Sequence, residues 1–508
     1  MKRLLITCLA CGLSGCLTAS LFAGAALEPT IPASGWLATA LEQISTDRML
    51  ADIRTLSGRA YGGRLTGSAY DESSAAFVAT RFGELRLHRA PAAPPASQTN
   101  ALPQREWKQT ATVPTRTISD EFVVEIGTPR QRLTLERGSQ VLPVLDSPSA
   151  DVRGRIVFVG YGIVDASQGI DDYAGVDVRN AVVLFLRGKP EHYQKPVAHA
   201  DKERLAKQHG AVGYLTATGP ILTLYEQRKG VTGLPSAYYS GTVVDDQLPG
   251  AWISTETADR IVSQASGAAT LRTVQDALNR SGGSRSTVTE ATVEMKWSTR
   301  VESGTMFNVV SVIRGHAPGD GAVLVGAHRD HFGQQAGLLF AGADDNASGT
   351  AVMLEVARVL ALAPDAPKHS VLFLSFSGEE QGLIGSRLYV SQPIVPLAKT
   401  IGMINVDHAA VGNGRLTIGV TGFDKSAAQS VGERVGLADM LDVYGYFPGG
   451  DHVPFKEAGV PTVTIVSSGV HPHFHQPSDT ADTVKGEILR SIARYLLALT
   501  WQLAYETP

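Results

Sequence analysis

The sequence is poor in cysteine and confines what it has to one end of the chain. Three cysteines occur in 508 residues: Cys8, Cys11 and Cys16. They lie within residues 1–26, where Lys2 and Arg3 precede an apolar run that ends in small residues, the pattern of an export signal. Without this signal the chain has no thiol for an internal disulfide or for a thiolate metal site. We therefore expect its stability to come from packing and from bound metal.

The export signal allows two kinds of mature N-terminus. The run Leu13-Ser14-Gly15-Cys16 resembles a bacterial lipobox, which would place a lipid anchor at Cys16. The apolar stretch continues to Ala26, however, and fits plain cleavage after a small residue equally well. The sequence thus predicts an exported protein that is periplasmic or secreted, or an outer-membrane lipoprotein.

Long apolar runs and an excess of basic charge are also missing. Beyond the signal, no stretch reaches the roughly 18 unbroken apolar residues of a spanning helix, so we expect no transmembrane segment in the mature chain. The chain carries 45 Lys and Arg against 49 Asp and Glu, which argues against nucleic acid as a partner. With 43% hydrophobic and 19% charged residues, the composition predicts a globular protein, and the length predicts two or three domains.

Three patterns follow one another along the chain after the signal. Residues 27–140 contain two segments with helical spacing of apolar residues, which we interpret as the N-terminal helical part of the main domain. Residues 141–286 hold short β-rich runs and predict an inserted domain. Residues 287–508 alternate near-continuous apolar strands with amphipathic helices. This order predicts an α/β fold of three layers, with helices on both faces of a mainly parallel sheet, interrupted by the β-rich insert.

Polar side chains gather where the apolar runs of the last segment end. His328 and Asp330 end one run, and Glu379 and Glu380 follow the next. Asp407 ends a third run. Because ligands of open α/β sheets bind beyond the carboxyl ends of the strands, we expect these side chains to face one crevice.

Two small polar loops add a carboxylate and an imidazole to this crevice. Asp345 lies in the loop 342–349, directly before a helix, and His475 lies in the loop 471–477. Imidazole nitrogens and carboxylate oxygens together suit zinc and similar divalent ions. Five such groups can hold two ions when one carboxylate bridges them, and such a pair activates a shared water molecule. Of two adjacent glutamates, one can bind metal while its neighbour takes the proton of that water.

Five motifs in this order resemble those of the co-catalytic zinc aminopeptidases. They are G-A-H-R-D-H (326–331), G-A-D-D-N-A-S-G (342–349), S-G-E-E-Q-G (377–382), N-V-D (405–407) and H-Q-P-S-D-T (475–480). This metallopeptidase family includes bacterial leucyl aminopeptidases, glutamate carboxypeptidase, the glutaminyl cyclases and the non-catalytic transferrin receptor. The predicted insert resembles a protease-associated domain, through D-D-Y-A-G-V-D (171–177) and the strand that follows.

The resemblance implies a hydrolase with two zinc ions per chain that cleaves the N-terminal peptide bond of peptides with a free N-terminus. Asp345 would be the bridging ligand. Glu379 would be the general base for the bridging water, and Asp330 would orient His328 from the side away from the metal. The complete ligand set implied by the family is His328, Asp345, Glu380, Asp407 and His475.

Several residues leave rival functions open. Arg329, beside a ligand, could bind a substrate carboxylate and make the enzyme a carboxypeptidase or dipeptidase, or it could pair with a nearby acid. A non-catalytic receptor would have lost ligands, and none of the five is missing. Phe474 stands where secreted relatives commonly have tyrosine, so a metal ion alone, or Tyr444 or Tyr446, would stabilise the oxyanion.

Histidines outside the ligand set are interpreted as structural. His471 and His473 flank Pro472, which predicts a solvent-exposed loop. His452 is expected to make hydrogen bonds without binding metal.

Overall fold

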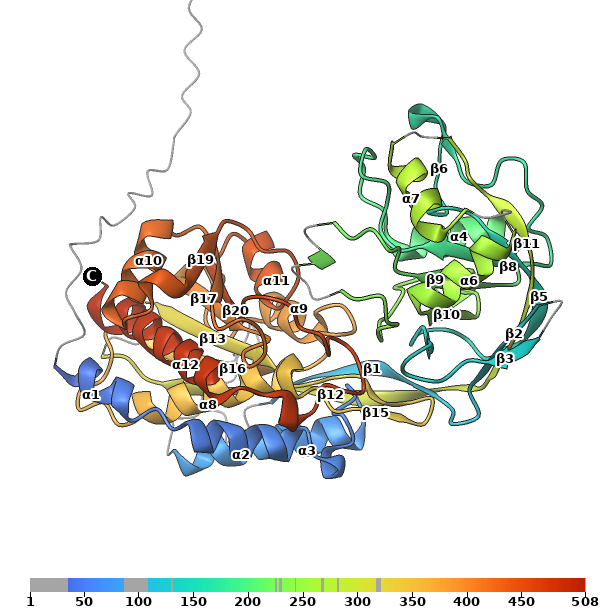
Figure 1. Ribbon diagram of the computed structural model, residues 1–508. Helices are drawn as coiled ribbons and strands as arrows, with labels where there is room; N and C mark the ends of the chain where they lie inside the picture. Colours follow the sequence, from blue (N-terminus) through green and yellow to red (C-terminus); the bar gives the residue numbers. More distant parts are fainter. Residues whose placement is uncertain are drawn as a thin grey trace, which may run out of the picture.

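The computed structural model consists of two bodies joined by a long strand pair, as Figure 1 shows. The predicted signal and the Cys16 anchor lie outside the described residues and stay predictions. In the part of the chain that is described, no helix is long and apolar enough to cross a membrane. The described residues are 35–85, 108–128, 131–223, 226–227, 231–242, 244–265, 269–280, 283–316 and 321–507.

The first body is built on an eight-stranded mixed sheet with a parallel centre. Its strands are β1 (Lys108–Ile118), β12 (Thr299–Ile313), β16 (Ser370–Phe376), β13 (Ala322–His328), β17 (Thr400–Val406), β20 (Thr462–Ser467), β18 (Leu416–Thr421) and β19 (Leu441–Tyr444), in that order across the sheet. The four strands from β16 to β20 are parallel to one another, whereas β12 and β18 run antiparallel to them. Parallel strands buried on both faces explain the near-continuous apolar runs of the sequence.

Helices cover both faces of this sheet and make three layers. One face packs against five helices: α2 (Thr46–Leu56), α3 (Ala69–Glu84), α8 (Gly349–Leu360), α10 (Lys425–Arg434) and α12 (Gly486–Trp501), with α1 (Trp36–Glu42) beside α12. The other face packs against α9 (Ile384–Ser391) and α11 (His452–Glu457) through Tyr389 and Phe455. The predicted α/β class is confirmed.

The second body is a β-rich insert between β1 and β12, which pair antiparallel over 11 residues and lead into and out of it. Its eight strands are β3 (Arg132–Thr134), β2 (Val123–Gly127), β11 (Thr287–Trp297), β5 (Ala150–Phe158), β8 (Val182–Leu186), β9 (Gly213–Ala217), β10 (Gly250–Ile253) and β4 (Val141–Pro143). The helices α4 (His199–Gln208), α6 (Thr255–Ala265) and α7 (Leu271–Arg280) accompany this sheet. The sheet thus extends beyond residues 141–286 on both sides.

Candidate metal centre

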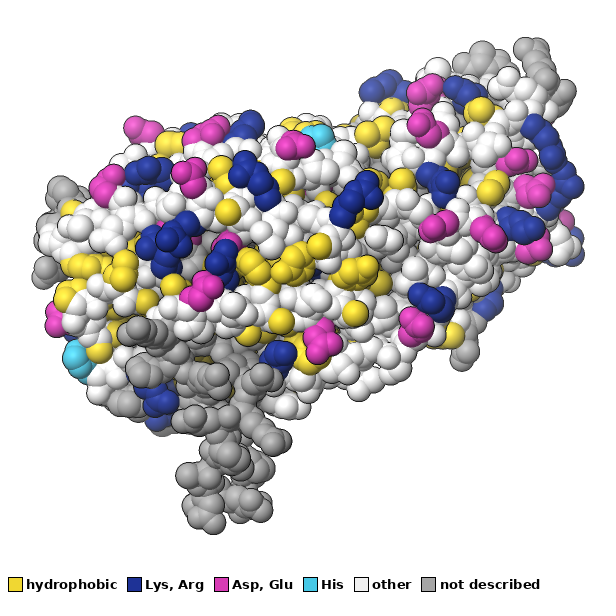
Figure 2. Space-filling model, turned by 90° about the horizontal axis from the view of Figure 1, so that it is seen from below, with side chains coloured by type: hydrophobic (Ala, Val, Ile, Leu, Met, Phe, Trp, Pro, Cys, Tyr) yellow, Lys and Arg dark blue, Asp and Glu magenta, His cyan; other side chains and the backbone are white. Residues whose placement is uncertain are grey.

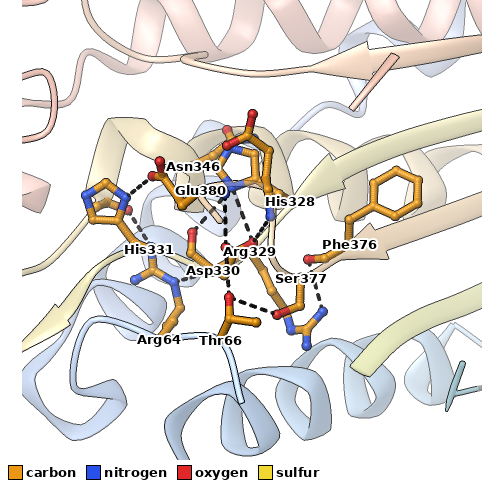
Figure 3. Close-up of polar contacts among 12 residues, drawn as sticks. Arg64, Thr66, His328, Arg329, Asp330, His331, Asn346, Phe376, Ser377 and Glu380 are labelled. Carbon is orange, nitrogen blue, oxygen red and sulfur yellow. Dashed lines mark hydrogen bonds and ion pairs between the residues drawn. The ribbon is translucent and has the colours of Figure 1, made fainter. Parts of the chain in front are cut away.

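The sequence-predicted site residues meet at the carboxyl edge of the parallel strands. His328 is the last residue of β13, and Asp407 follows the last residue of β17. Glu379 and Glu380 lie in the turn after β16, and His475 lies in the loop after β20. Because parallel strands end at the same edge, residues far apart in sequence come together there. Figure 3 shows His328 and Glu380 from this group, with the residues behind them.

Two sets of donor atoms share the carboxylate of Asp345. In the first set, His328 Nε2 lies 3.4 Å from Asp345 Oδ1 and 3.3 Å from Asp407 Oδ1. In the second set, His475 Nε2 lies 3.1 Å from Asp345 Oδ2 and 3.4 Å from Glu380 Oε2. One oxygen of Asp345 therefore faces each set.

These separations fit zinc. Ligands bound at about 2.0–2.1 Å in a tetrahedron stand about 3.3 Å apart, whereas a charged hydrogen bond draws the same atoms to about 2.7–2.9 Å. Three of the four separations, at 3.3, 3.4 and 3.4 Å, lie closer to the first value, and the 3.1 Å between His475 Nε2 and Asp345 Oδ2 lies between the two values. The donor types and most of the separations therefore fit zinc, and Asp345 belongs to both donor sets.

A tight turn between Gly342 and α8 positions Asp345. Gly342 has a φ of +55°, and a Cβ atom there would lie 2.2 Å from the carbonyl oxygen of Asp345, so a larger residue would clash. Asp479 accepts the backbone N–H of Asp344 at 2.9 Å and that of Asp345 at 3.0 Å. The fully buried Arg64 donates to the carbonyl of Gly342 at 2.7 Å. Hydrogen bonds from two other segments thus fix the loop backbone around Asp345.

Asp330 connects the first histidine with the glutamate turn. His328 Nδ1 lies 3.3 Å from the backbone carbonyl of Asp330 and 3.6 Å from its carboxylate. The same carboxylate accepts the N–H groups of Glu379 and Glu380, at 3.3 and 3.4 Å, and the hydroxyl of Thr66 at 3.0 Å. One fully buried acid therefore lies behind both elements (Figure 3).

Sequence reasoning missed His331 as part of this site. Its Nδ1 lies 2.7 Å from Glu380 Oε1, a hydrogen-bond distance that leaves no space for an ion between the atoms. Burial holds the pKa of His331 well below its usual range, so the ring is neutral. This contact orients Glu380, as Figure 3 shows. The sequence signal for His331 was its place at the end of the motif G-A-H-R-D-H (326–331).

Several buried carboxyl groups lie close together in the site, and the pKa values of Glu379 and Glu380 are raised. Burial, together with the charge of Asp451, raises the pKa of Glu379 well above its ordinary value, against the effect of His328. Burial and the charge of Asp345 raise the pKa of Glu380 in the same way. Such a group of acids needs protons or cations for compensation, and divalent cations satisfy it at neutral pH.

A third cluster of histidine and carboxylate beside the site consists of Asp344, His408 and His471. Asp344 Oδ2 lies 2.6 Å from His471 Nδ1 and 3.3 Å from His408 Nδ1. The shorter distance is a direct hydrogen bond. His471 Nε2 lies 3.1 Å from the carbonyl of Ser467, and the residue is only 6% exposed, so the prediction of a solvent-exposed loop is wrong for it. Although burial opposes protonation, Asp345 and other acids raise the pKa of His408 to about 10.

Arg329 points away from the site. Its guanidinium is fully buried and forms an ion pair with Asp71 at 2.5 Å, and it also donates to the carbonyls of Ser375 and Phe376. Asp71 lies near the start of α3, whose N-cap is Ser68. The interpretation of Arg329 as a clamp for substrate carboxylates is therefore wrong, and its pairing with an acid is correct.

The aromatic residues considered for a role near His475 differ in position. Phe474 stacks on His475 with ring centroids 3.7 Å apart, and lies 5.3 Å from the ring of His408. Tyr444 and Tyr446 are 40% and 47% exposed. His452 is buried, with Nε2 2.8 Å from the carbonyl of Phe447, in agreement with the structural role expected of it.

Comparisons with known protein sequences agree with this geometry. Residues 308–500 match the family described as peptidase family M28. An aminopeptidase from Bacillus subtilis (strain 168) is 29% identical over 175 residues, which cover 32% of this chain and 37% of that protein. A probable glutamate carboxypeptidase from Arabidopsis thaliana is 26% identical over 292 residues, 53% of this chain and 39% of that protein. The matches thus span less than half the length of these relatives.

The fold is shared along almost the whole chain with a solved structure. BSAP, a zinc aminopeptidase from Bacillus subtilis, superposes with a TM-score of 0.59 and 20% sequence identity, over 91% of this chain and 96% of that one. This likeness shows the fold. The family resemblance seen in the five motifs is confirmed.

Proposed function

Since the chain carries a peptidase family M28 domain over residues 308–500, we propose that it is a zinc-dependent aminopeptidase that hydrolyses the N-terminal peptide bond of peptides. The proposed zinc ligands are His328, Asp345, Glu380, Asp407 and His475. The observation that carries the proposal is the position of Asp345, whose two oxygens face separate donor sets 3.1–3.4 Å away. That arrangement matches a bridging carboxylate between two ions.

In the proposed mechanism, the protein's own groups move and hold protons. Bound zinc would supply Lewis acidity to the scissile carbonyl and to a water molecule. Glu379 takes the proton of that water and passes it to the leaving amine. Asp330 holds the Glu379-Glu380 turn in place beside His328, because its carboxylate accepts the backbone N–H groups of both glutamates. A metal ion or a nearby acid would hold the free amine of the substrate.

We assign the other parts of the chain as follows. The chain up to β1 and from β12 onward would form the peptidase domain, and the insert between these two strands would be a protease-associated domain that narrows the cleft. Residues 1–26 would direct export to the periplasm or the medium. The signal would be removed either by cleavage before a lipid-bearing Cys16 or by plain cleavage after a small residue. The mass of the N-terminal peptide of the exported protein distinguishes cleavage before Cys16 with lipid from plain cleavage.

A carboxypeptidase with the same metal site is the second candidate, because one relative is named a probable glutamate carboxypeptidase. Such an enzyme needs a basic group for the terminal carboxylate of its substrate. Arg329 cannot serve, since it is fully buried against Asp71.

The test combines metal content with substrate choice. Zinc is titrated into chelated protein while release from unblocked aminoacyl amides, N-acetylated aminoacyl amides and N-blocked dipeptides is followed. We expect two zinc ions per chain and cleavage of the unblocked amides alone. Cleavage of the N-blocked dipeptides would establish a carboxypeptidase, zinc binding without any cleavage would indicate a receptor, and absence of zinc binding would refute the site.

A further inference from the structure

A residue of the insert forms hydrogen bonds with His475, a member of the second donor set. His475 Nδ1 lies 2.9 Å from the backbone carbonyl oxygen of Ala237, and Ala237 N–H donates to the carbonyl of His475 at 2.8 Å. Ala237 lies between β9 and β10, two strands of the insert. A carbonyl accepts and never donates, so this contact requires the proton on Nδ1. The lone pair of Nε2 is then free to face Asp345 and Glu380.

The two histidines of the site differ in this respect. His328 Nδ1 faces Asp330, which belongs to the same body. Around His475, Asp345 and Glu380 face Nε2, and two rings of the same body contact the imidazole: Phe474 stacks on it and Phe332 meets it edge-on at 4.7 Å. Rings fix the plane of an imidazole and leave its tautomer undetermined. The insert supplies the hydrogen bond that fixes it.

Ala237 is held firmly on the insert side. Residues 236–241, named here the docking segment, are anchored by Asp146, whose carboxylate accepts the N–H of Ser240 at 2.7 Å and that of Gly241 at 2.8 Å. Leu145 N–H also donates to the carbonyl of Tyr238 at 2.9 Å. The position of the Ala237 carbonyl therefore follows the position of the insert as a whole.

The docking segment packs against the peptidase domain through apolar contacts. Leu142, Leu145 and Ala237 of the insert form one fully buried cluster with Phe332 and Phe340 of the peptidase domain. At its margin, Gln381 Nε2 donates to the hydroxyl of Tyr239 at 3.3 Å, one residue beyond Glu380. The same contacts that hold the insert against the peptidase domain therefore place the Ala237 carbonyl beside His475.

We infer that docking of the insert completes the second zinc site, with the carbonyl of Ala237 as a positioning group for His475. The inference rests on the proposed two-zinc centre and adds that its two sites depend differently on the insert. The site of His328 is supported within the peptidase domain. The site of His475 binds zinc tightly only while the docking segment lies against Phe332 and Phe340, because outer hydrogen bonds of this kind are worth roughly 10- to 100-fold in metal affinity.

Two variants of the full chain release the docking segment in different ways. Ala237→Glu places a charge in the buried apolar cluster, and Asp146→Ala removes the anchor of Ser240 and Gly241. The matched control is Asp172→Ala, because Asp172 also accepts two backbone N–H groups in the insert, those of Tyr161 and Ile163 at 3.1 and 3.0 Å, which lie outside the docking segment. Circular dichroism and gel filtration verify folding of each variant.

Stepwise affinities are measured by zinc titration against a competing chromogenic chelator, without substrate. We expect one of the two sites to weaken about 10- to 100-fold in both docking variants, while the other site, and both sites of Asp172→Ala, keep wild-type affinity. Wild-type affinity at both sites of a folded docking variant would overturn the inference, as would equal weakening in the control. Absence of zinc binding by the wild-type chain would instead refute the proposed function, and the inference with it.

Discussion

Asp479 lies directly behind Asp345 and accepts its backbone N–H at 3.0 Å, while its second oxygen accepts the N–H of Asp344 at 2.9 Å. Asp479 is 1% exposed, and it comes four residues after His475. A single carboxylate therefore ties the loop of the bridging ligand to the loop of the second histidine. The geometry of the two donor sets depends on this tie as much as on the ligands themselves.

Replacing Asp479 by asparagine should loosen both loops. The amide nitrogen would face one of the two N–H groups, which would be left buried and unsatisfied at a cost of about 1–3 kcal/mol. We expect a lower melting temperature and zinc binding weakened by roughly 10-fold or more. Thermal melts with and without zinc measure both effects. Asp424→Asn is the control, because Asp424 accepts one backbone N–H at the exposed start of α10 and should leave zinc binding unchanged.

Replacing Glu379 by glutamine should separate catalysis from metal binding. Glutamine keeps the size of the side chain but cannot take a proton from water, so we expect turnover to fall roughly 100- to 10,000-fold with both zinc ions retained. Steady-state kinetics and zinc analysis of the same sample provide the measurement. Glu457→Gln, at an exposed ion pair with Arg387, is the control. Near-normal turnover of the glutamine variant would remove Glu379 from the role of general base.

The sequence was informative about the site where local pattern and topology agree. His328 ends a buried strand, and Glu380 and Asp407 follow two others. Because parallel strands end at one edge, the sequence alone predicted that these residues meet. Asp345 and His475 were found through loop motifs and family resemblance. The insert boundaries were less visible, because β2 and β3 precede residue 141 and their short runs carry little signal.

The residues that sequence reasoning missed act through contacts between distant segments. Asp71 pairs with Arg329 across 258 positions, and Ala237 meets His475 across 238. His471 looked like a loop residue because Pro472 follows it, yet its buried partner Asp344 decides its environment. No periodicity encodes such pairs, since packing of separate elements creates them.

Replacing Arg329 by methionine should reduce stability and leave substrate choice unchanged. The variant would leave the carboxylate of Asp71 buried without its charged partner, at a cost of about 3–5 kcal/mol. Burial already raises the pKa of Asp71 to about 6, against the effect of Arg329, so loss of the cation would raise it further. Chemical denaturation measures the loss. A changed preference between substrates with free and amidated C-termini would contradict the buried position of Arg329.

Zinc binding should release protons and strengthen as pH rises. In the metal-free protein, burial raises the pKa of Asp451 to about 7 and that of Asp479 to about 8, and it raises those of Glu379 and Glu380 in the same direction. Below these values the acids hold protons that the charge of zinc must displace, so the apparent affinity falls as pH falls from about 8 to 5.

Calorimetric zinc titrations in two buffers of different ionisation enthalpy count the protons released at each pH. Asp451→Asn is the informative variant, because Asp451 belongs to the crowded acids without belonging to either donor set. Its removal should lower the number of protons released near pH 7 and flatten the dependence of affinity on pH. Since a neutral asparagine no longer stabilises the cations, zinc affinity above pH 8 should fall below that of the wild type. An affinity that does not change between pH 5 and 8 would show that the acids are already ionised without metal.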